Sequence, residues 1–294
     1  MIGFPSLDEI SAQQYLGQTF GQDEASLALF CIFIFDFYKE QKREFPWRDT
    51  SDPYRILLSE VMLQQTQTSR VLPKYERFLS LWPTFETFST CSLDELLAEW
   101  KGLGYNRRAL NLRKSAKMTE QWNWTIPDDE DLILSLPGVG KSTSSAILCF
   151  CYNEKAIYLE TNIRRVLLTC FFPEETQVSD KVLEELLKRL ALMVEDMKAW
   201  YYALMDYGVL LKELLPNANT RSAHYTKQSK FKNSNRQIRG LLIHVLSDTG
   251  PKSLDSLYSL LDNFEEERVF ACLKQLESEG FVQENEARYG ISKD

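Results

Sequence analysis

Two short segments of this chain combine residue types that can do chemistry on an anionic substrate. The first, residues 136–140, reads Leu-Pro-Gly-Val-Gly between two helical segments. A Gly-x-Gly turn lets backbone N–H groups approach a bound anion, and the helix after it favours phosphate at its N-terminus. The second, residues 160–166, supplies a carboxylate, Glu160, and an amide, Asn162. Together they suit binding of a DNA backbone beside a reactive centre, although a Gly-x-Gly turn alone is more often only a tight turn.

Length and composition indicate a globular protein. The chain has 294 residues, of which 44% are apolar, and this length favours two domains over one. No apolar run is long enough to span a membrane. Residues 28–37 are very apolar, but acids precede them and Asp36 interrupts them, which indicates a buried helix and not a signal peptide. The six cysteines are scattered, so we expect a reduced cytoplasmic, nucleoid-associated protein without disulfides.

The charge pattern predicts a basic face on an acidic protein. The net charge of −8 argues against a generic nucleic-acid binder, yet residues 100–119 and 214–247 contain no acid. The bases in these stretches are Lys101, Arg107, Arg108, Arg113, Lys114 and Lys117, then Arg221, Lys227, Lys230, Lys232, Arg236 and Arg239. Two interpretations remain open, a polyanion-binding face and ordinary solvated charge.

Helical periodicity dominates the first 230 residues, which predicts an all-α fold. Apolar residues recur at steps of three and four over 55–81 and over 181–205, as expected of amphipathic helices. A further helix is predicted at 92–100, because Ser92 can cap it and acids fill its first turn. No strong alternating pattern appears before residue 280.

The last sixty or so residues predict a separate small unit. We expect helices at 238–246, 253–261 and 265–279, followed by a hairpin that includes residues 281–282 and 289–291. This order resembles a winged helix. The third helix is rich in glutamate, which favours a stabilising or protein-contacting role over DNA reading.

A series of motifs in fixed order carries a resemblance to a known family. The motifs are Phe45-Pro46-Trp47-Arg48, Asp52-Pro53-Tyr54, residues 59–67 (Ser-Glu-Val-Met-Leu-Gln-Gln-Thr-Gln), residues 102–105 (Gly-Leu-Gly-Tyr), Arg107 to Leu112, residues 136–140, residues 160–166 and residues 205–208 (Met-Asp-Tyr-Gly). They resemble the adenine DNA glycosylases of the helix-hairpin-helix superfamily, the MutY type, over roughly residues 25–230. The most specific part is the Gln-Gln-Thr-Gln run that follows Glu60.

The resemblance assigns roles to individual residues. It implies that Glu60, among apolar neighbours that favour a raised pKa, is the general acid that protonates the leaving base. Glu160 would stabilise the developing oxocarbenium ion, with the Asn162 amide near the acid. Gln65 and Tyr105 would wedge into the duplex and contact the opposite base. The residues alone also permit a surface glutamate, a surface glutamine and a core tyrosine at these positions. Other expected DNA-binding residues are Arg48, Gly138, Gly140, Lys141, Ser142, Arg221, Lys227 and Lys230.

Two departures from the family concern catalysis. The family has aspartate where this chain has Glu160, and a displacement of about 1 Å at a reacting centre can cost on the order of a hundredfold in rate. Bifunctional lyases of the superfamily have a lysine where this chain has Ser142, and the adjacent Lys141 would point about 100° away on a helix. No Schiff-base nucleophile is offered, so we expect a monofunctional glycosylase.

Two further departures concern the cofactor and the tail. Relatives hold a [4Fe–4S] cluster with four cysteines, whose positions here are Lys212, Asn219, Ser222 and Gln228. We therefore expect no iron–sulfur cluster and no metal site, and name only the 136–140 hairpin as a candidate site for a monovalent cation. The larger C-terminal domain that senses 8-oxoguanine in relatives is replaced by the small terminal unit, so recognition of the opposite base is the least constrained expectation.

The expected organisation and activity follow from these motifs. We expect an N-terminal extension at 1–24, a helical subdomain at 25–46 and 156–232, a six-helix subdomain at 47–155 with the hairpin 136–141, and a winged-helix-like domain at 236–294, with a DNA cleft between the helical subdomains. The expected function is excision of adenine opposite 8-oxoguanine or guanine, by a monomer acting on double-stranded DNA that contains a mispair or lesion. The alternatives are a glycosylase for another mismatched base, such as thymine, and a catalytically impaired DNA-binding homologue.

Overall fold

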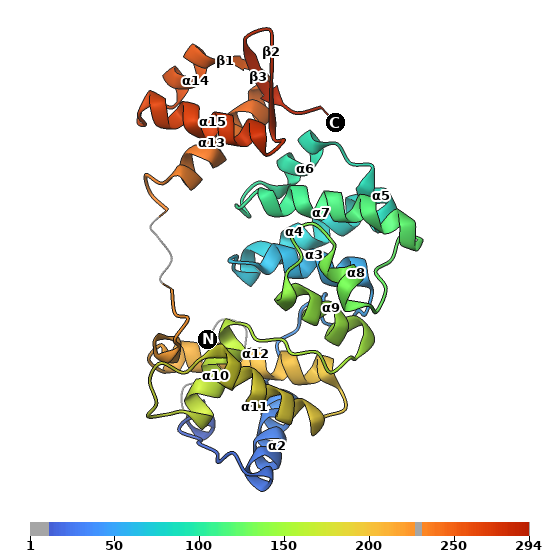
Figure 1. Cartoon of the computed structure of the whole chain (residues 1–294), viewed down its shortest axis with the longest axis vertical. Coiled ribbons are helices and arrows are strands. Elements are labelled where there is room, and N and C mark those ends of the chain that lie inside the picture. Colours follow the sequence, from blue (N-terminus) through green and yellow to red (C-terminus); the bar gives the residue numbers. More distant parts are fainter. Residues whose placement is uncertain (1–11, 227–230, 294) are drawn as a thin grey trace. The chain divides into compact units, whose positions relative to one another are not determined.

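The computed structural model describes residues 12–226 and 231–293, which form two compact units (Figure 1). Residues 12–56, 128–134 and 139–226 form the first unit. Residues 57–127, 135–138 and 231–293 form the second. The subdomain boundaries expected from the motifs stay a prediction. No helix in these described stretches is long and apolar enough to cross a membrane.

The first unit is helical. Its elements are η1 (Gln13–Tyr15), α2 (Glu24–Gln41), α8 (Glu130–Leu134), α9 (Lys141–Tyr152), α10 (Thr161–Phe171), α11 (Asp180–Leu192), α12 (Met197–Leu214) and η3 (Ala218–Arg221). Helix α12 packs against α10, α2 and α9 (Figure 1). Aromatic rings fill the core between these helices, with Phe30 edge-on to both Phe171 and Trp200. This packing fixes where α10 begins, which is the position of the Glu160 motif.

The second unit contains a helical part and the C-terminal domain. Its helical elements are α3 (Pro53–Leu63), whose first residues belong to the first unit, α4 (Thr68–Leu81), α5 (Phe85–Ser89), α6 (Leu93–Trp100), α7 (Arg107–Met118) and η2 (Thr119–Trp122). Helix α6 begins at the predicted cap, because Ser92 and Glu95 form a reciprocal capping box. The all-α prediction is confirmed for both units up to the C-terminal domain.

The apolar pattern over 55–81 and the single long helix predicted at 181–205 each correspond to two helices in the structure. The pattern over 55–81 forms α3 and α4, separated at residues 64–67, where Gln65 takes a positive φ of 56°. The pattern over 181–205 forms α11 and α12, because Asp196 caps a new helix by accepting from the Ala199 amide. The apolar spacing continues across the break at 193–196, so periodicity alone does not reveal it, whereas residues 64–70 contain no apolar residue and coincide with the break between α3 and α4.

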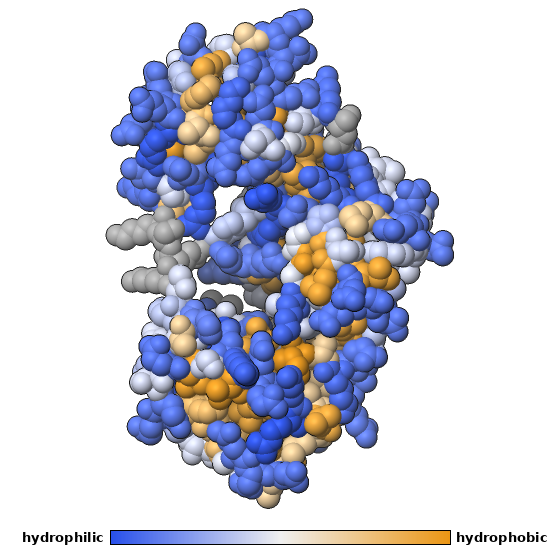
Figure 2. Space-filling view, in the orientation of Figure 1, coloured by the Kyte–Doolittle hydropathy of each residue, from blue (hydrophilic) through white to orange (hydrophobic). Residues whose placement is uncertain are grey.

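The C-terminal domain has winged-helix order. Its elements are α13 (Asn235–Thr249), β1 (Lys252–Ser253), α14 (Leu254–Leu260), α15 (Glu266–Ser278), β2 (Val282–Asn285) and β3 (Arg288–Ile291). The strands form an antiparallel sheet in the order β1-β3-β2, so the predicted hairpin gains a third short strand. The face of this domain seen in Figure 2 is mostly hydrophilic.

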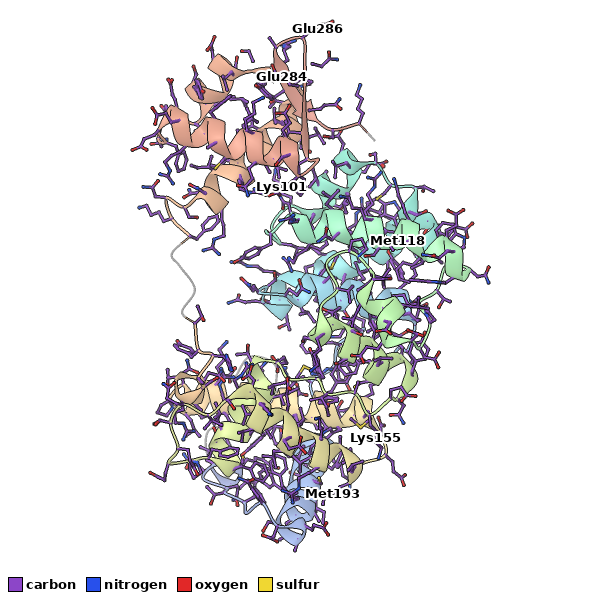
Figure 3. The ribbon with its side chains drawn as sticks, in the orientation of Figure 1. Lys101, Met118, Lys155, Met193, Glu284 and Glu286 are labelled. Atoms are coloured by element: carbon purple, nitrogen blue, oxygen red, sulfur yellow. The ribbon has the colours of Figure 1, made fainter. Side chains whose placement is uncertain are left out.

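Helix α13 packs on α15 and β3 within the C-terminal domain and also contacts α6. At the C-terminal end of α6, Lys101 forms an ion pair with Asp248 of α13 at 3.1 Å, and Lys101 is labelled in Figure 3. The C-terminal domain is thus docked on the α6 side of its own unit.

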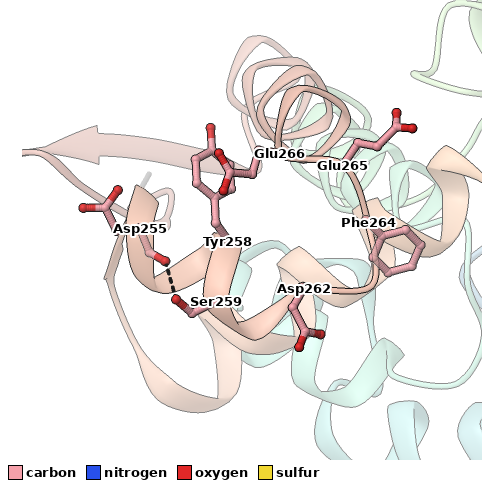
Figure 4. A pocket seen from close by; sticks show the side chains of 7 residues that line it. All are labelled: Asp255, Tyr258, Ser259, Asp262, Phe264, Glu265 and Glu266. Carbon is pink, nitrogen blue, oxygen red and sulfur yellow. Dashed lines mark hydrogen bonds between the residues drawn. The ribbon is translucent and has the colours of Figure 1, made fainter.

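Acidic side chains surround a pocket at the start of α15. Carboxylates of Asp255, Asp262, Glu265 and Glu266 line it together with Tyr258, Ser259 and Phe264 (Figure 4). A cluster of like negative charge repels phosphate. This placement agrees with the expectation that the third helix of the domain does not read DNA.

Candidate active site and nucleic-acid interface

Glu160 is the N-cap of α10, and its carboxylate is tied to the first turn. Oε1 accepts hydrogen bonds from the backbone N–H of Asn162 at 2.8 Å and of Ile163 at 3.0 Å. Burial raises the pKa of the Glu160 carboxyl, and the two amide bonds act in the opposite direction. A negative charge is favourable at a helix N-terminus, although aspartate caps helices more often than glutamate does.

The Asn162 amide is oriented from both ends. Its Nδ2 donates to Glu160 Oε2 at 3.3 Å, and its Oδ1 accepts from Nη1 of the buried Arg165 at 2.8 Å. The same Arg165 nitrogen donates to the Gly208 carbonyl at 3.0 Å, which joins α10 to α12. The chain therefore holds a carboxylate and an amide in one defined geometry, as a site that stabilises developing charge requires.

Gly208 explains the glycine of the 205–208 motif. A Cβ at this position would lie 2.4 Å from the backbone oxygen of Asn162, so α12 can approach α10 this closely only with glycine. Sequence reasoning assigned no role to Arg165 or Gly208. The signal for Arg165 was available, because it lies three residues after Asn162 on a helix.

Arg48 has a different role from the predicted DNA contact. Its Nη1 and Nη2 donate to the two oxygens of Asp206, each at 2.7 Å, and Arg43 binds the same carboxylate. The side chains of Arg48 and Asp206 are 7% and 0% exposed. Arg48 therefore forms a buried ion pair that anchors the 43–48 segment to α12. This finding corrects the prediction that Arg48 binds DNA.

Arg221 also serves the fold and not the predicted DNA surface. Its guanidinium donates to the carbonyls of Leu168 and Phe172, at 3.0 and 2.8 Å, and also to that of Pro173. These carbonyls belong to the C-terminal end of α10, where a cation is favoured by the helix dipole. The other two residues of this prediction, Lys227 and Lys230, lie outside the described residues.

The hairpin between α8 and α9 retains the features expected of a phosphate site. Gly138 takes a φ of 77°, and a Cβ there would lie 2.5 Å from the Asn111 side-chain nitrogen. Gly140 is the N-cap of α9 and has no side chain to occupy the first-turn amides. Gly138, Gly140, Lys141 and Ser142 are all exposed. These positions suit the predicted backbone contact with DNA.

Glu60 and Gln65 lie at the C-terminal end of α3. Glu60 is partly exposed, whereas the flanking Leu58 and Val61 are buried. Gln65 is exposed on the turn after the helix and has a positive φ. Tyr105, on the 102–105 turn, is 36% exposed and likewise has a positive φ of 49°. Such backbone conformations cost of order 1–3 kcal/mol each and cluster at functional sites.

Arg108 joins the turn that carries Gln65 to the turn that carries Tyr105. Its Nη1 donates to the carbonyls of Val61, Met62 and Gln64 at 2.6–2.9 Å. Its Nη2 donates to Thr66 Oγ1, to the Leu103 carbonyl and to the Gly104 carbonyl at 3.0–3.1 Å. Burial lowers the pKa of Arg108 to about 10, so it stays charged at neutral pH.

The first basic stretch is therefore partly structural. Arg108 holds two turns together, and the buried Arg113 donates to the Cys91 carbonyl at 2.7 Å. The other four bases of this stretch are exposed, namely Lys101, Arg107, Lys114 and Lys117. A run of bases in the sequence overstates the charge that is available to phosphate.

The positions that replace the cluster cysteines of relatives hold other interactions. Lys212 lies on α12, and the buried Asn219 donates to the Thr161 carbonyl at 3.2 Å. Ser222 is buried and forms a β-bridge with Val178, while Gln228 is outside the described residues. Within 12–226 and 231–293, no group of three His, Cys, Asp or Glu residues is placed to hold a metal ion.

Comparison with known proteins relates this site to a family. Residues 58–192 match the HhH-GPD superfamily of base excision DNA repair proteins. The chain is 37% identical over 177 residues to an adenine DNA glycosylase of Buchnera aphidicola subsp. Baizongia pistaciae. This alignment covers 58% of this chain and 49% of that protein. It is 31% identical over 230 residues to the adenine DNA glycosylase of Mycobacterium tuberculosis H37Rv, which covers 71% of this chain and 76% of that protein.

A solved structure gives the same result. The structure of a thermostable thymine-DNA glycosylase matches with a TM-score of 0.54 and 28% identity, over 62% of this chain and 85% of that one. Fold, hairpin and relatives define a helical DNA repair enzyme. The chain belongs to the HhH-GPD superfamily of base excision DNA repair proteins. Within this superfamily it is a DNA glycosylase, and DNA is its partner.

Proposed function

We propose that this chain is a monofunctional adenine DNA glycosylase that removes adenine mispaired with 8-oxoguanine or guanine. The observation that carries the proposal is the capped carboxylate at the start of α10, with Glu160, Asn162 and Arg165 in one hydrogen-bonded arrangement. The match to adenine DNA glycosylases at 31–37% identity supports adenine as the base that is released.

Each residue then has a chemical task. Glu60 donates a proton to the leaving purine, because a neutral base is a far better leaving group than its anion. The Glu160 carboxylate stabilises positive charge on the sugar as the N-glycosidic bond breaks, and water completes the hydrolysis. Gln65 and Tyr105 enter the duplex while the target base is outside the stack.

The residues at the start of α9 bear on whether the reaction includes strand scission. Ser142 and Lys141 sit at the start of α9; the serine has no amine, and the Lys141 side chain is exposed and not enclosed in a site. We propose accordingly that strand scission is not part of the reaction. We also propose that the enzyme works without an iron–sulfur cluster, as a cytoplasmic monomer, with the 136–140 hairpin as a candidate site for a monovalent cation.

A second candidate substrate is a mismatched thymine. It is favoured by the structural match to a thymine-DNA glycosylase. The two candidates share the carboxylate chemistry and differ in the base that is released.

A panel of labelled duplexes separates these possibilities. Single-turnover reactions would contain adenine opposite 8-oxoguanine, adenine opposite guanine, thymine opposite guanine, or adenine opposite thymine, each followed by alkaline scission. We expect product from the first two only, and none without alkali. Glu60→Gln is the control and should bind the duplex without releasing base. Release of thymine but not adenine would replace the proposal with the second candidate.

A further inference from the structure

The C-terminal domain reaches the tyrosine that is expected to meet the base opposite adenine. Arg236, in the first turn of α13, donates a hydrogen bond from Nη1 to the Tyr105 hydroxyl. Its guanidinium carbon lies 5.6 Å from the centre of the Tyr105 ring. Arg108 lies at the same distance of 5.6 Å from that ring. Tyr105 is thus contacted by one guanidinium from its own subdomain and by one from the C-terminal domain.

The contact between Arg236 and Tyr105 is part of a larger interface between α13 and the α6 end of the same unit. At the other end of α13, Asp248 binds Lys101 at 3.1 Å and His244 at 3.0 Å. The two ends of this contact, residues 236 and 248, are about 18 Å apart along the helix. Between them, Arg239 holds the pKa of the Glu279 carboxyl below its usual value, with a smaller contribution from Arg107 of α7. Contacts at the two ends of α13, with Tyr105 and Lys101, therefore hold this helix against the 101–105 segment, whereas the Arg239–Glu279 pair lies within the C-terminal domain.

Tyr105 needs such support. A tyrosine with positive φ is uncommon, and a ring that is 36% exposed on a turn has rotamer freedom unless a neighbour restrains it. A guanidinium that both faces an aromatic ring and binds its hydroxyl restrains the ring plane and its direction.

We propose that Arg236 is a positioning residue for Tyr105, through which the C-terminal domain sets how the enzyme distinguishes the base opposite its target. The statement about the opposite base rests on the proposed function. The contact itself rests only on residues 105, 108 and 236. The acidic pocket on the far part of the same domain has no role in this proposal.

The test uses the full chain and a matched control. Arg236→Ala removes the contact, whereas Arg288→Ala removes one exposed positive charge from the same domain, on β3. The measured quantity is the ratio of single-turnover rates for adenine opposite 8-oxoguanine and opposite guanine. We expect Arg236→Ala to lower this ratio about tenfold, Arg236→Lys to restore part of it, and Arg288→Ala to leave it unchanged.

A double-mutant cycle tests the route through the tyrosine. In a Tyr105→Phe background the hydroxyl is gone, so Arg236→Ala should lower the ratio by clearly less than tenfold. The proposal is overturned if the full effect persists in that background. It is also overturned if Arg236→Ala slows both duplexes equally, because a general loss of positive charge would do the same.

A binding experiment keeps this proposal separate from the proposed function. In the Glu60→Gln background, the affinities for duplexes with 8-oxoguanine and with guanine opposite adenine are compared for Arg236→Ala and Arg288→Ala. If the native chain releases no adenine, the proposed function fails, and this comparison still decides the role of Arg236. Selective loss of 8-oxoguanine preference with Arg236→Ala supports the proposal, and equal loss with both variants refutes it.

Discussion

Shortening the Glu160 side chain by one methylene should separate its role as a helix cap from its proposed role in catalysis. In Glu160→Asp the charge stays, and an aspartate N-cap still reaches the amides of the first turn. The carboxylate, however, retreats by about 1.5 Å, one carbon–carbon bond. We therefore expect the stability to stay within about 0.5 kcal/mol of the native chain, while the excision rate falls on the order of a hundredfold.

The structure gives the reason for expecting a loss and not a gain. Oε1 already serves both the Asn162 and Ile163 amides, and Oε2 reaches the Asn162 side chain at 3.3 Å. The glutamate is thus fitted to its site with the backbone as it stands. A shorter residue would keep the cap and change where the charge lies relative to the sugar.

Two companion variants define the result. Glu160→Gln keeps length and shape but removes the charge, and Glu160→Asn removes both length and charge, so both should stop catalysis. Asp196→Asn is the control, because it alters an exposed capping carboxylate on α12 at a distance in sequence from the site. Rates come from single-turnover excision of adenine opposite 8-oxoguanine, and stabilities from thermal melts. A Glu160→Asn protein with the native rate would refute the assignment of Glu160 to catalysis.

The remaining predictions concern pH, packing, the buried ion pair and iron. Because burial raises the pKa of Glu160 in the folded state, ionisation of this carboxyl lowers the stability of the fold as pH rises through that pKa. Activity needs the ionised form, so acidification should lower the excision rate while it removes this loss of stability. Glu160→Gln should lack the stability effect in a pH series of thermal melts. Gly208→Ala should destabilise the chain by about 1–3 kcal/mol through overpacking against Asn162, measured by denaturant unfolding. Asp206→Asn should cost about 3–5 kcal/mol because it leaves Arg48 buried without its charged partner, and the loss is measured by denaturant unfolding. The purified protein should be colourless, and stoichiometric iron with a broad visible absorbance band would contradict the proposal that it lacks a cluster.

Motifs and periodicity predicted the fold class, because each local pattern has its own physical cause. Ser92 and Glu95 cap α6 as expected, and the terminal helices and hairpin form where turn residues and periodicity placed them. The break at 193–196 was not predicted, since the apolar spacing runs through it.

The distribution of basic residues along the sequence does not reveal which of them are exposed on the surface. Arg48, Arg113 and Arg221 are engaged by a carboxylate or by carbonyls in the fold, and a count of bases does not distinguish them from exposed lysines. The distinction depends on burial, which tertiary packing decides. The geometry around Asn162 was likewise out of reach, because it depends on a glycine more than forty residues away on another helix.

The six donations of Arg108 have a consequence for how Gln65 and Tyr105 are presented. If Gln65 and Tyr105 both enter the duplex, as proposed, they do so from two turns that one guanidinium holds together. Neither turn can then shift far without the other, because a separate movement would break the hydrogen bonds that Arg108 makes to it. The two side chains are therefore presented at a spacing that a single guanidinium maintains.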